Sequence, residues 1–305
     1  MGVNISKLGT LRIAGIQFRA TEDVDRNVNK GKELLKLAGG EDVKVVSFAE
    51  LFHLPWFPHK RGADPSSFAE TIPGPIVEEF SPLAEKMAAV FVLPILEVER
   101  GKNKDGNRYY NTAAVVDADG KYLGKYRKVH IPQLPLWYEK DYFTPGGGGK
   151  GARDPFPVFQ TKYVKLGVQI CWDNYFPEGS RVLGLNGAEL IVSPTAAAMK
   201  THERWEKVIS ANAITNGLFA MRVNRTGSEA AQDFYGESFC VDPNGEMIGE
   251  PSGMNDGVSI FEIDLKMIKE VREMWPFYED RRPELYGQRS CPGLKLGIKK
   301  KLNAR

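Results

Sequence analysis

Apolar runs rich in β-branched residues recur along the chain and alternate with segments of helical spacing. We predict buried strands over residues 11–18, 43–48, 90–96, 112–116, 164–170, 190–193, 218–223 and 258–263. Apolar residues at helical spacing predict helices over residues 24–37, 76–89, 177–185, 202–216 and 265–274. The alternation predicts an α/β fold in which helices cover sheets.

Two turn dipeptides add antiparallel pairs to this pattern. Asp119-Gly120 and Asn244-Gly245 each follow an apolar run, and a glycine at the second turn position favours a hairpin. We therefore expect mixed sheets. The glycine-rich stretch 145–153 is short and lacks the Lys-Ser/Thr pair of a phosphate loop, so we interpret it as a surface loop. We predict a single domain over residues 1–270 and a C-terminal extension over residues 271–305.

Charge and cysteine content restrict the function classes. The chain has 41 Lys and Arg against 39 Asp and Glu, and this balance gives no electrostatic case for binding nucleic acid or an anionic membrane. The basic tail, residues 295–305, is expected to be solvated. Neither a signal peptide nor a run of about 20 apolar residues is present, so we expect a cytoplasmic protein. The three cysteines, Cys171, Cys240 and Cys291, fit reduced thiols better than disulfides or a zinc site.

Cys171 lies where a predicted strand gives way to a predicted helix. An apolar run ends at Ile170, and Pro177 fits the first turn of a helix. A strand-to-helix turn presents a side chain and backbone N–H groups to a reacting carbonyl, which suits a nucleophile. A cysteine in this place is also commonly a buried apolar side chain, so the spacing leaves both interpretations open.

Glu50 and Lys128 also follow predicted strands. Glu50 comes after the run that ends at Phe48, and strand ends are where α/β proteins gather their sites. Burial raises the pKa of a carboxyl group and suits it to proton transfer, although a glutamate here could instead cap a helix or pair with a surface lysine. A positioned ammonium such as that of Lys128 can stabilise an oxyanion, although lysines in basic stretches are commonly solvated.

Three motifs together carry a resemblance that none carries alone. Phe48-Ala-Glu50, Tyr126-Arg-Lys128-Val-His130 and Ile170-Cys171-Trp-Asp173 occur in this order. From about Leu11 to Leu265 the chain resembles the nitrilase superfamily of carbon–nitrogen hydrolases. The resemblance implies a four-layer αββα sandwich with Glu50, Lys128 and Cys171 as its catalytic residues. Glu139 matches a second glutamate that is often found between the lysine and the cysteine. Supporting elements are also present at Tyr110-Asn111-Thr112, Ser193-Pro194-Thr195, Asn224-Arg225 and Tyr235-Gly236-Glu237-Ser238.

The resemblance implies hydrolysis through a covalent intermediate, without a metal or an organic cofactor. Glu50 takes the proton of the Cys171 thiol, and the thiolate attacks an amide or carbamoyl carbon of a small molecule. Lys128 and the backbone N–H of Trp172 stabilise the oxyanion. Glu50 protonates the leaving nitrogen, and water positioned with the help of Glu139 hydrolyses the thioester.

The segment Cys171-Trp-Asp-Asn-Tyr-Phe-Pro-Glu178 resembles the corresponding segment of the N-carbamoylputrescine amidases. That resemblance implies N-carbamoylputrescine as substrate and putrescine, ammonia and carbon dioxide as products. It implies substrate contacts from Trp172, Asp173, Tyr138 and Thr195, with Asp173 or another carboxylate and aromatic rings near the substrate ammonium. Asn174 and Tyr175 stand where amidases of N-carbamoyl amino acids tend to carry an arginine.

Several alternatives stay open. Leu134-Pro-Leu136 and Ala196-Ala-Ala-Met199 are more apolar than expected, which leaves an aliphatic amidase or a nitrilase as the alternative. A Cys-His enzyme would use His130 as base. A non-catalytic binding module is disfavoured because Glu50, Lys128 and Cys171 are all present. The resemblance also implies a homo-oligomer, in which Met274-Trp-Pro-Phe-Tyr278 would be an interface or part of the core.

Overall fold

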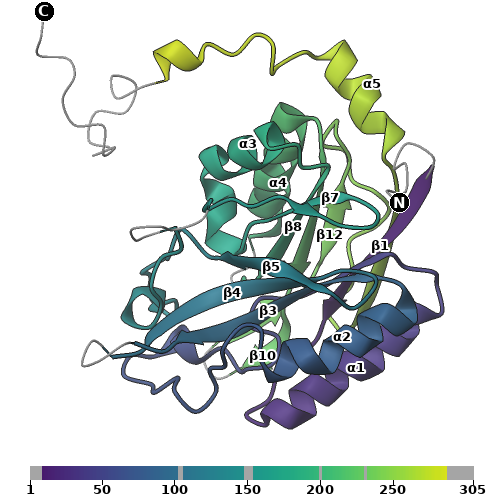
Figure 1. Cartoon of the computed structure of the whole chain (residues 1–305). Coiled ribbons are helices and arrows are strands. Elements are labelled where there is room, and N and C mark those ends of the chain that lie inside the picture. The colour runs from purple at the N-terminus through teal and green to yellow at the C-terminus, as the bar shows by residue number, and fades with distance from the viewer. Residues whose placement is uncertain (1–8, 102–105, 148–153, 199–200, 230–231, 287–305) are drawn as a thin grey trace, which may run out of the picture.

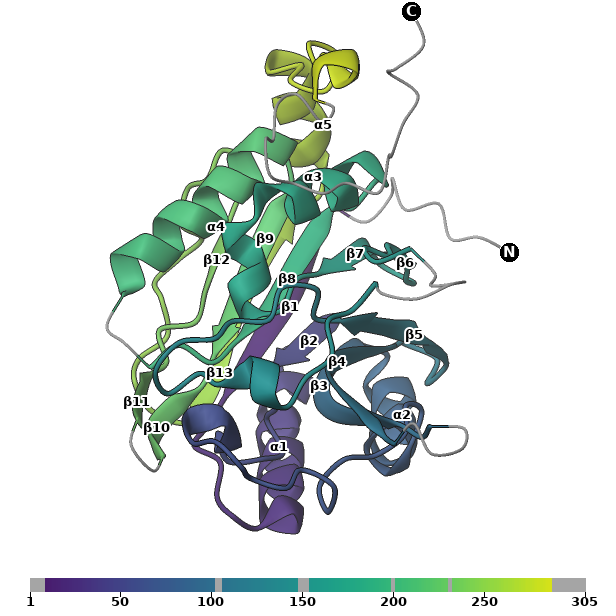
Figure 2. The same ribbon diagram turned by 90° about the vertical axis from the view of Figure 1, so that its left-hand side faces the viewer.

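The chain folds into two mixed sheets that pack face to face, with helices on their outer faces (Figures 1 and 2). The structure, a computed structural model, describes residues 9–101, 106–147, 154–198, 201–229 and 232–286. The basic tail, Cys291, Met199 and most of the glycine-rich stretch lie outside these residues. The helices are α1 (Val24–Gly39), α2 (Pro75–Met87), α3 (Pro177–Leu185), α4 (His202–Asn216) and α5 (Lys266–Met274).

The first sheet has the strand order β13-β1-β2-β3-β4-β5. Its strands are β1 (Thr10–Gln17), β2 (Val45–Phe48), β3 (Val90–Glu99), β4 (Arg108–Val116), β5 (Tyr122–Arg127) and β13 (Gly257–Asp264). Strands β1, β2 and β3 pair in parallel, whereas β13, β4 and β5 add antiparallel edges.

The second sheet repeats this plan with the strand order β12-β9-β8-β7-β6. Its strands are β6 (Phe159–Gln160), β7 (Lys165–Val168), β8 (Leu190–Thr195), β9 (Phe219–Asn224) and β12 (Phe239–Val241). Strands β7, β8 and β9 are parallel, and both edge strands are antiparallel. A separate ribbon pairs β10 (Thr226–Glu229) with β11 (Gln232–Tyr235). The prediction of mixed sheets is confirmed.

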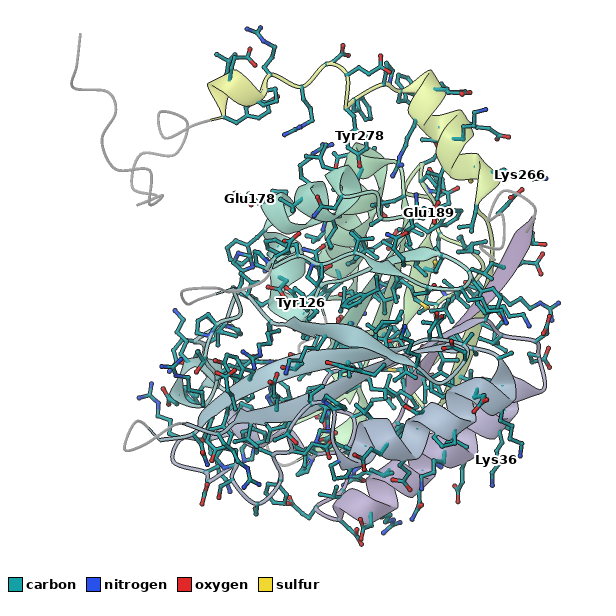
Figure 3. All side chains as sticks on the ribbon, in the orientation of Figure 1. Lys36, Tyr126, Glu178, Glu189, Lys266 and Tyr278 are labelled. Carbon is teal, nitrogen blue, oxygen red and sulfur yellow. The ribbon has the colours of Figure 1, made fainter. Side chains whose placement is uncertain are left out.

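The alternation of side chains along each strand builds the layers. On β1, Ile13 belongs to the apolar core between the two sheets, whereas its neighbour Ala14 faces the core under α1 and α2. Helices α3 and α4 cover the second sheet on the opposite side of the molecule (Figure 2). The order is therefore helix, sheet, sheet, helix in one domain, as the αββα expectation requires. Side chains on the outer helix faces, such as the labelled Lys36 and Lys266, are exposed (Figure 3).

Local sequence signals fix where helices begin and end. The Asp23 carboxylate accepts a hydrogen bond from the Arg26 backbone N–H and caps α1. Pro75 and Pro177 occupy the first turns of α2 and α3, as expected for Pro177. Gly217 ends α4 with a φ of 53°, a left-handed conformation that glycine adopts readily.

Only one of the two predicted hairpins is a full strand pair. Asp119-Gly120 connects β4 to β5, which pair antiparallel. Asn244-Gly245 also forms a turn, but the segment beyond it meets β12 through an isolated bridge between Val241 and Met247 and a hydrogen bond from the Ile248 N–H to the Cys240 carbonyl oxygen, not as a strand. The second turn is followed by Pro251 and several glycines, which do not continue a strand.

Candidate active site

A fully buried lysine lies between two fully buried carboxylates. Lys128 directly follows β5, and its Nζ donates hydrogen bonds of 2.7 Å to Glu50 Oε1 and 2.7 Å to Glu139 Oε2. All three side chains have 0% exposure. Burial lowers the pKa of an ammonium, but the charges of Glu139 and Glu50 outweigh it and raise the pKa of Lys128 above its usual value. Lys128 is therefore a permanent cation at this position.

Each carboxylate keeps one oxygen without a protein partner. Glu50 Oε1 also accepts a hydrogen bond of 2.7 Å from Asn111 Nδ2, whereas Glu50 Oε2 and Glu139 Oε1 have no hydrogen-bond partner among the described residues. Buried polar atoms are normally paired, so two free oxygens in one cluster indicate a place where water, substrate or a transferred proton binds.

Arg225 holds the backbone that carries Glu50. Glu50 follows β2, and the next residue, Leu51, has a left-handed φ of 49°. Arg225 Nη1 donates to the carbonyl oxygens of Glu50 at 2.9 Å and Leu51 at 3.0 Å. Its guanidinium also forms a buried bidentate pair with Glu229. The strained turn is therefore fixed by a charge pair whose two residues lie between β9 and the end of β10.

Cys171 opens a short 3-10 helix (Cys171–Tyr175) between β7 and α3. It has a left-handed φ of 47°, which is unusual for a residue with a Cβ and typical of a nucleophile on a tight turn. Burial raises the pKa of the thiol well above its usual value, and the charges of Glu50 and Glu139 add to this effect, whereas Lys128 opposes it. The resting side chain is therefore a neutral thiol, and it needs a base to become a nucleophile.

Asp173 holds this turn rather than offering a free carboxylate to a ligand. Its Oδ2 accepts hydrogen bonds from Tyr126 Oη at 2.6 Å and the Ile170 backbone N–H at 3.0 Å. Its Oδ1 lies 2.8 Å from both the backbone nitrogen and the Nδ1 of His130. Since Asp173 is fully buried and both oxygens are occupied, the expected contact with a substrate ammonium is corrected to a role in positioning the turn.

His130 belongs to the same set of contacts around Asp173. Its ring stacks on Phe176 with centroids 3.9 Å apart while Nδ1 contacts Asp173. The Cys-His alternative would need this ring at the Cys171 thiol, whereas the group whose charge acts most strongly on Cys171 is Glu50. The geometry favours the carboxylate as base.

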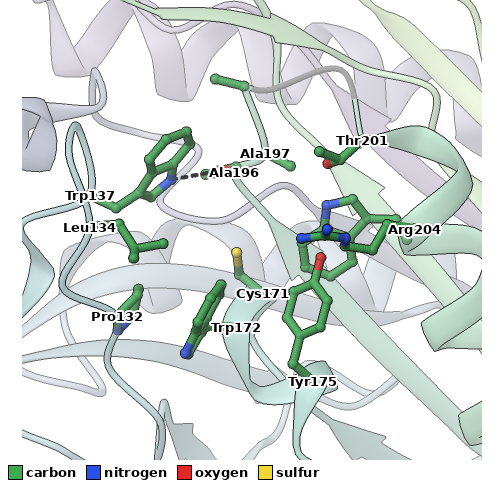
Figure 4. A pocket seen from close by; sticks show the side chains of 12 residues that line it. Pro132, Leu134, Trp137, Cys171, Trp172, Tyr175, Ala196, Ala197, Thr201 and Arg204 are labelled. Carbon is green, nitrogen blue, oxygen red and sulfur yellow. Dashed lines mark hydrogen bonds between the residues drawn. The ribbon is translucent and has the colours of Figure 1, made fainter.

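A small cavity of about 120 Å³ opens above the Cys171 sulfur (Figure 4). One wall is apolar and consists of Pro132, Leu134, Trp137, Ala196, Ala197 and Ala198. Trp137 is held there by a hydrogen bond of 3.1 Å from its Nε1 to the Ala196 carbonyl. The other lining residues are Trp172 and Tyr175, which follow Cys171 in the turn, and Thr201, Arg204 and Trp205 at the beginning of α4.

The remaining predicted contact residues divide between wall and interior. Trp172 lies on the cavity wall. Thr195 is fully buried, and its hydroxyl donates to the Ser193 carbonyl oxygen at 3.0 Å. Tyr138 packs under the Arg61 guanidinium, 4.7 Å from its ring centroid, and is not among the residues that line the cavity.

Sequence reasoning missed Tyr175, Arg204 and Trp205 as cavity residues. Tyr175 was noted only as a residue that is not arginine, and the other two belong to a segment predicted as an ordinary covering helix. Asn212 on α4 donates a hydrogen bond of 3.0 Å to the Asn174 carbonyl oxygen and docks the helix on the Cys171 turn. The helical pattern alone does not reveal this docking, which brings the first turn of α4 to the cavity.

The described residues contain no group of three or more His, Cys, Asp or Glu side chains arranged to hold a metal ion. Within the same residues, none of the helices is both long enough and apolar enough to cross a membrane.

Known proteins resemble this chain in sequence and in fold. Residues 12–273 match the family model described as carbon-nitrogen hydrolase. An N-carbamoylputrescine amidase of Solanum lycopersicum is 35% identical over 90% of this chain and 93% of its own. A citrullinase of Francisella tularensis is 35% identical over 92% of this chain and 98% of its own.

A solved structure shows the same fold. The carbon-nitrogen hydrolase from Helicobacter pylori G27 superimposes with a TM-score of 0.80 at 31% identity, covering 91% of this chain and 97% of that one. The family match, the relatives and the shared architecture all span nearly the whole chain. The chain therefore belongs to the carbon–nitrogen hydrolase family of the nitrilase superfamily and is a hydrolase of carbon–nitrogen bonds.

Proposed function

We propose that this enzyme hydrolyses the terminal carbamoyl group of a small ureido compound through a thioester on Cys171. The observation that carries the proposal is the buried arrangement of Glu50, Lys128 and Glu139, whose charges all act on the Cys171 thiol. The two relatives named above support the ureido group, because N-carbamoylputrescine and citrulline both end in one.

The first half of the reaction forms the thioester. The neutral Cys171 thiol gives its proton to Glu50, whose Oε2 is free to accept it. The sulfur bonds to the carbamoyl carbon, and Lys128 balances the negative charge that develops on the oxygen. Glu50 then returns the proton to the departing nitrogen, and the carbon–nitrogen bond breaks.

The second half reverses these roles with water in place of the nitrogen. Water gives a proton to Glu50 and attacks the thioester carbon, and the Cys171 sulfur leaves as a thiol once it regains that proton. Glu139, through its free Oε1, helps to position the water and keeps Lys128 in place. The chemistry uses only side chains of this chain.

N-Carbamoylputrescine is the specific substrate that sequence similarity favours. The Cys171–Glu178 segment resembles the corresponding segment of the N-carbamoylputrescine amidases, and amidases of this compound are 33–35% identical to the chain. A second candidate activity is hydrolysis of a simple aliphatic amide or nitrile. The apolar wall of Leu134, Trp137 and Ala196 favours that alternative, because it offers the reacting group an uncharged neighbour.

Ammonia release tests the proposal. We expect the intact enzyme to release ammonia from N-carbamoylputrescine or citrulline. Release should be at least about 10³-fold slower in Cys171→Ala, because loss of the nucleophile in covalent catalysis can lower kcat by about 10⁶-fold. Cys240→Ala, which removes a buried thiol elsewhere, serves as the matched control and should retain activity. Release only from amides or nitriles would discard the ureido assignment, and equal rates in Cys171→Ala would discard the mechanism.

A further inference from the structure

The far wall of the cavity carries a positive charge that the catalytic scheme does not use. Arg204, in the first turn of α4, is the only charged side chain among the described residues that line the cavity. Its guanidinium forms no hydrogen bond or ion pair with the part of the chain that the structure describes. Figure 4 shows it beside the Tyr175 hydroxyl, across the cavity from Trp137.

A second arginine lies directly behind the same wall. Arg222 on β9 is fully buried, and its guanidinium lies 4.9 Å from the ring centroid of Trp205, which itself lines the cavity. Arg222 donates hydrogen bonds to Tyr235 Oη at 2.9 Å and to the Glu237 carbonyl oxygen at 3.3 Å, both of them uncharged acceptors. Within the described residues no carboxylate pairs with it. A buried cation without a counter-ion is costly unless an anion comes close.

The pKa of Tyr175 is affected by the charges of both Arg204 and Arg222, so both charges act on the cavity wall. Burial raises the pKa of Tyr175 to about 12 and the Cys171 thiolate charge would raise it further, whereas the charges of Arg204 and Arg222 lower it. The Tyr175 hydroxyl on the cavity wall therefore lies within the field of both guanidinium groups. A substrate group in the same place experiences the same field.

Among the described residues, the cavity wall offers no negatively charged partner for a positive charge. None of those lining residues is Asp or Glu, and both carboxylate oxygens of the nearby Asp173 are occupied by hydrogen bonds. An ammonium at this end would meet two arginines, whereas a carboxylate would meet a planar guanidinium fork that matches its geometry.

We infer that Arg204 determines specificity by binding a carboxylate at the end of the substrate opposite to the carbon that Cys171 attacks. The inference rests on the proposed function and names its substrate class as ureido acids rather than ureido amines. The sequence places Asn174 and Tyr175 where amidases of N-carbamoyl amino acids tend to carry an arginine, so no carboxylate-binding arginine was expected from that segment. In the fold, α4 supplies a guanidinium to the cavity from a segment about thirty residues further along the chain.

Three probes of equal chain length test the inference. They are 4-ureidobutyrate, N-carbamoylputrescine and N-butylurea, which share the ureidopropyl unit and differ in carrying an anionic, a cationic or a neutral end. We expect the intact enzyme to show the highest kcat/KM for 4-ureidobutyrate. In Arg204→Gln the ratio of kcat/KM for 4-ureidobutyrate to that for N-butylurea should fall about 10- to 100-fold, mainly through KM, as expected for losing a charge-assisted pair.

Matched variants separate this role from a general loss of charge. Lys207→Gln removes a positive charge from the same helix at a side chain that is 77% exposed and lies off the cavity, so the ratio should not change. Arg204→Glu should invert the preference toward N-carbamoylputrescine. A ratio that is equal in Arg204→Gln and the intact enzyme, or a preference of the intact enzyme for the cationic probe, would overturn the inference.

Binding to Cys171→Ala, measured by calorimetry, distinguishes this outcome from failure of the proposed function. Tighter binding of 4-ureidobutyrate than of N-butylurea, lost when Arg204→Gln is added, supports the carboxylate site even if turnover requires a different reacting group. Equal binding of the two compounds contradicts it, whatever the turnover results are.

Discussion

At the residue scale, the site is organised around one fixed positive charge and a nucleophile that is neutral at rest. Glu50 and Glu139 share Lys128, and the thiol of Cys171 lies within the field of all three. Forming a free thiolate here would add a negative charge to a buried cluster that already holds two carboxylates. In the proposed mechanism, proton transfer to Glu50 therefore accompanies attack on the substrate.

Substitution of the two candidate bases should give opposite results. Glu50→Gln keeps the hydrogen bond from Lys128 but cannot take a proton, so we predict a fall in kcat of at least about 10²-fold, the usual contribution of a general base. His130→Ala should retain substantial activity, because His130 is bound to Asp173 and stacked on Phe176. Steady-state rates, with circular dichroism to verify folding, check both; complete inactivity of a folded His130→Ala would reverse the assignment.

Glu139 should give the enzyme a pH dependence. Burial raises the pKa of Glu139 to about 8, against the opposing charge of Lys128. The Glu139 carboxyl group therefore takes up a proton at a higher pH than a free glutamate does, and only the ionised form pairs with Lys128 as a charge. We predict that kcat/KM falls as the pH drops from 9 to 6, and that this dependence disappears in Glu139→Gln. If kcat/KM of Glu139→Gln falls with pH as steeply as that of the intact enzyme, the pH dependence belongs to another group.

The sequence predicted some of these residues and not others for a physical reason. Glu50, Lys128 and Cys171 each follow a strand, so the pattern of apolar runs and the three motifs place them at strand ends. Asp173 belongs to the same motif as Cys171, but its role depends on Tyr126 and His130, partners more than 40 positions away. Arg204 depends on how α4 docks, which no local pattern encodes.

At the element scale, two strained turns present the reacting groups. Leu51 and Cys171 both have left-handed backbone conformations, which cost of the order of 1–3 kcal/mol each for such residues. Strain of this kind persists only where surrounding contacts hold it. Asn174 Nδ2 donates to the Cys171 carbonyl oxygen at 2.9 Å, and Arg225 holds the Leu51 turn.

Arg225 should therefore matter for both stability and rate. Arg225→Ala leaves the buried Glu229 carboxylate without its charge partner, so we predict a loss of about 3–5 kcal/mol in the free energy of unfolding, as for other broken buried pairs. The Glu50 turn also loses its support, and kcat should fall. Urea denaturation measures the first effect. In the double variant Arg225→Ala/Glu229→Gln, stability should return in part but activity should not; full recovery of activity would contradict a positioning role.

The predicted strands and helices were largely confirmed, and β12 lies in the apolar run expected before the Asn244-Gly245 turn. Strand β6 was not anticipated, because its two residues are too few to show an alternating pattern. The 3-10 helix that begins at Cys171 replaced the direct strand-to-helix turn expected there. The side chains of Asp173 and Asn174 in this 3-10 helix form hydrogen bonds with residues distant in the sequence, and a local sequence pattern does not show such tertiary contacts.

At the scale of the whole molecule, the site requires both sheets. Glu50 and Lys128 follow strands of the first sheet, and Cys171 follows a strand of the second. The apolar core between the sheets, with Ile13 and Val192 among its members, therefore also fixes the distance between nucleophile and base. Neither half of the sandwich contains a complete site.

The segment that follows the last helix predicts self-association. Met274, Trp275 and Phe277 have exposed fractions of 70%, 53% and 41%, and Trp275 stacks on Phe277. Large apolar side chains grouped on a surface are typical of contact regions. We expect a homo-oligomer by size-exclusion chromatography with light scattering, and a shift toward monomer in Trp275→Glu. The exposed charge change Lys269→Glu on α5 is the control, and a monomeric intact protein would refute the prediction.

In the proposed mechanism, the carbonyl carbon of the substrate is bonded to the Cys171 sulfur during turnover. Intact-protein mass spectrometry of an acid-quenched reaction detects this bond. With a ureido substrate in excess, we predict a mass increase of one carbamoyl group, located on the peptide that contains Cys171. The adduct should be absent from Cys171→Ala and should accumulate in Glu139→Gln, where water attack is impaired. Turnover that continues in Cys171→Ala, with no adduct on the intact enzyme, would contradict the account.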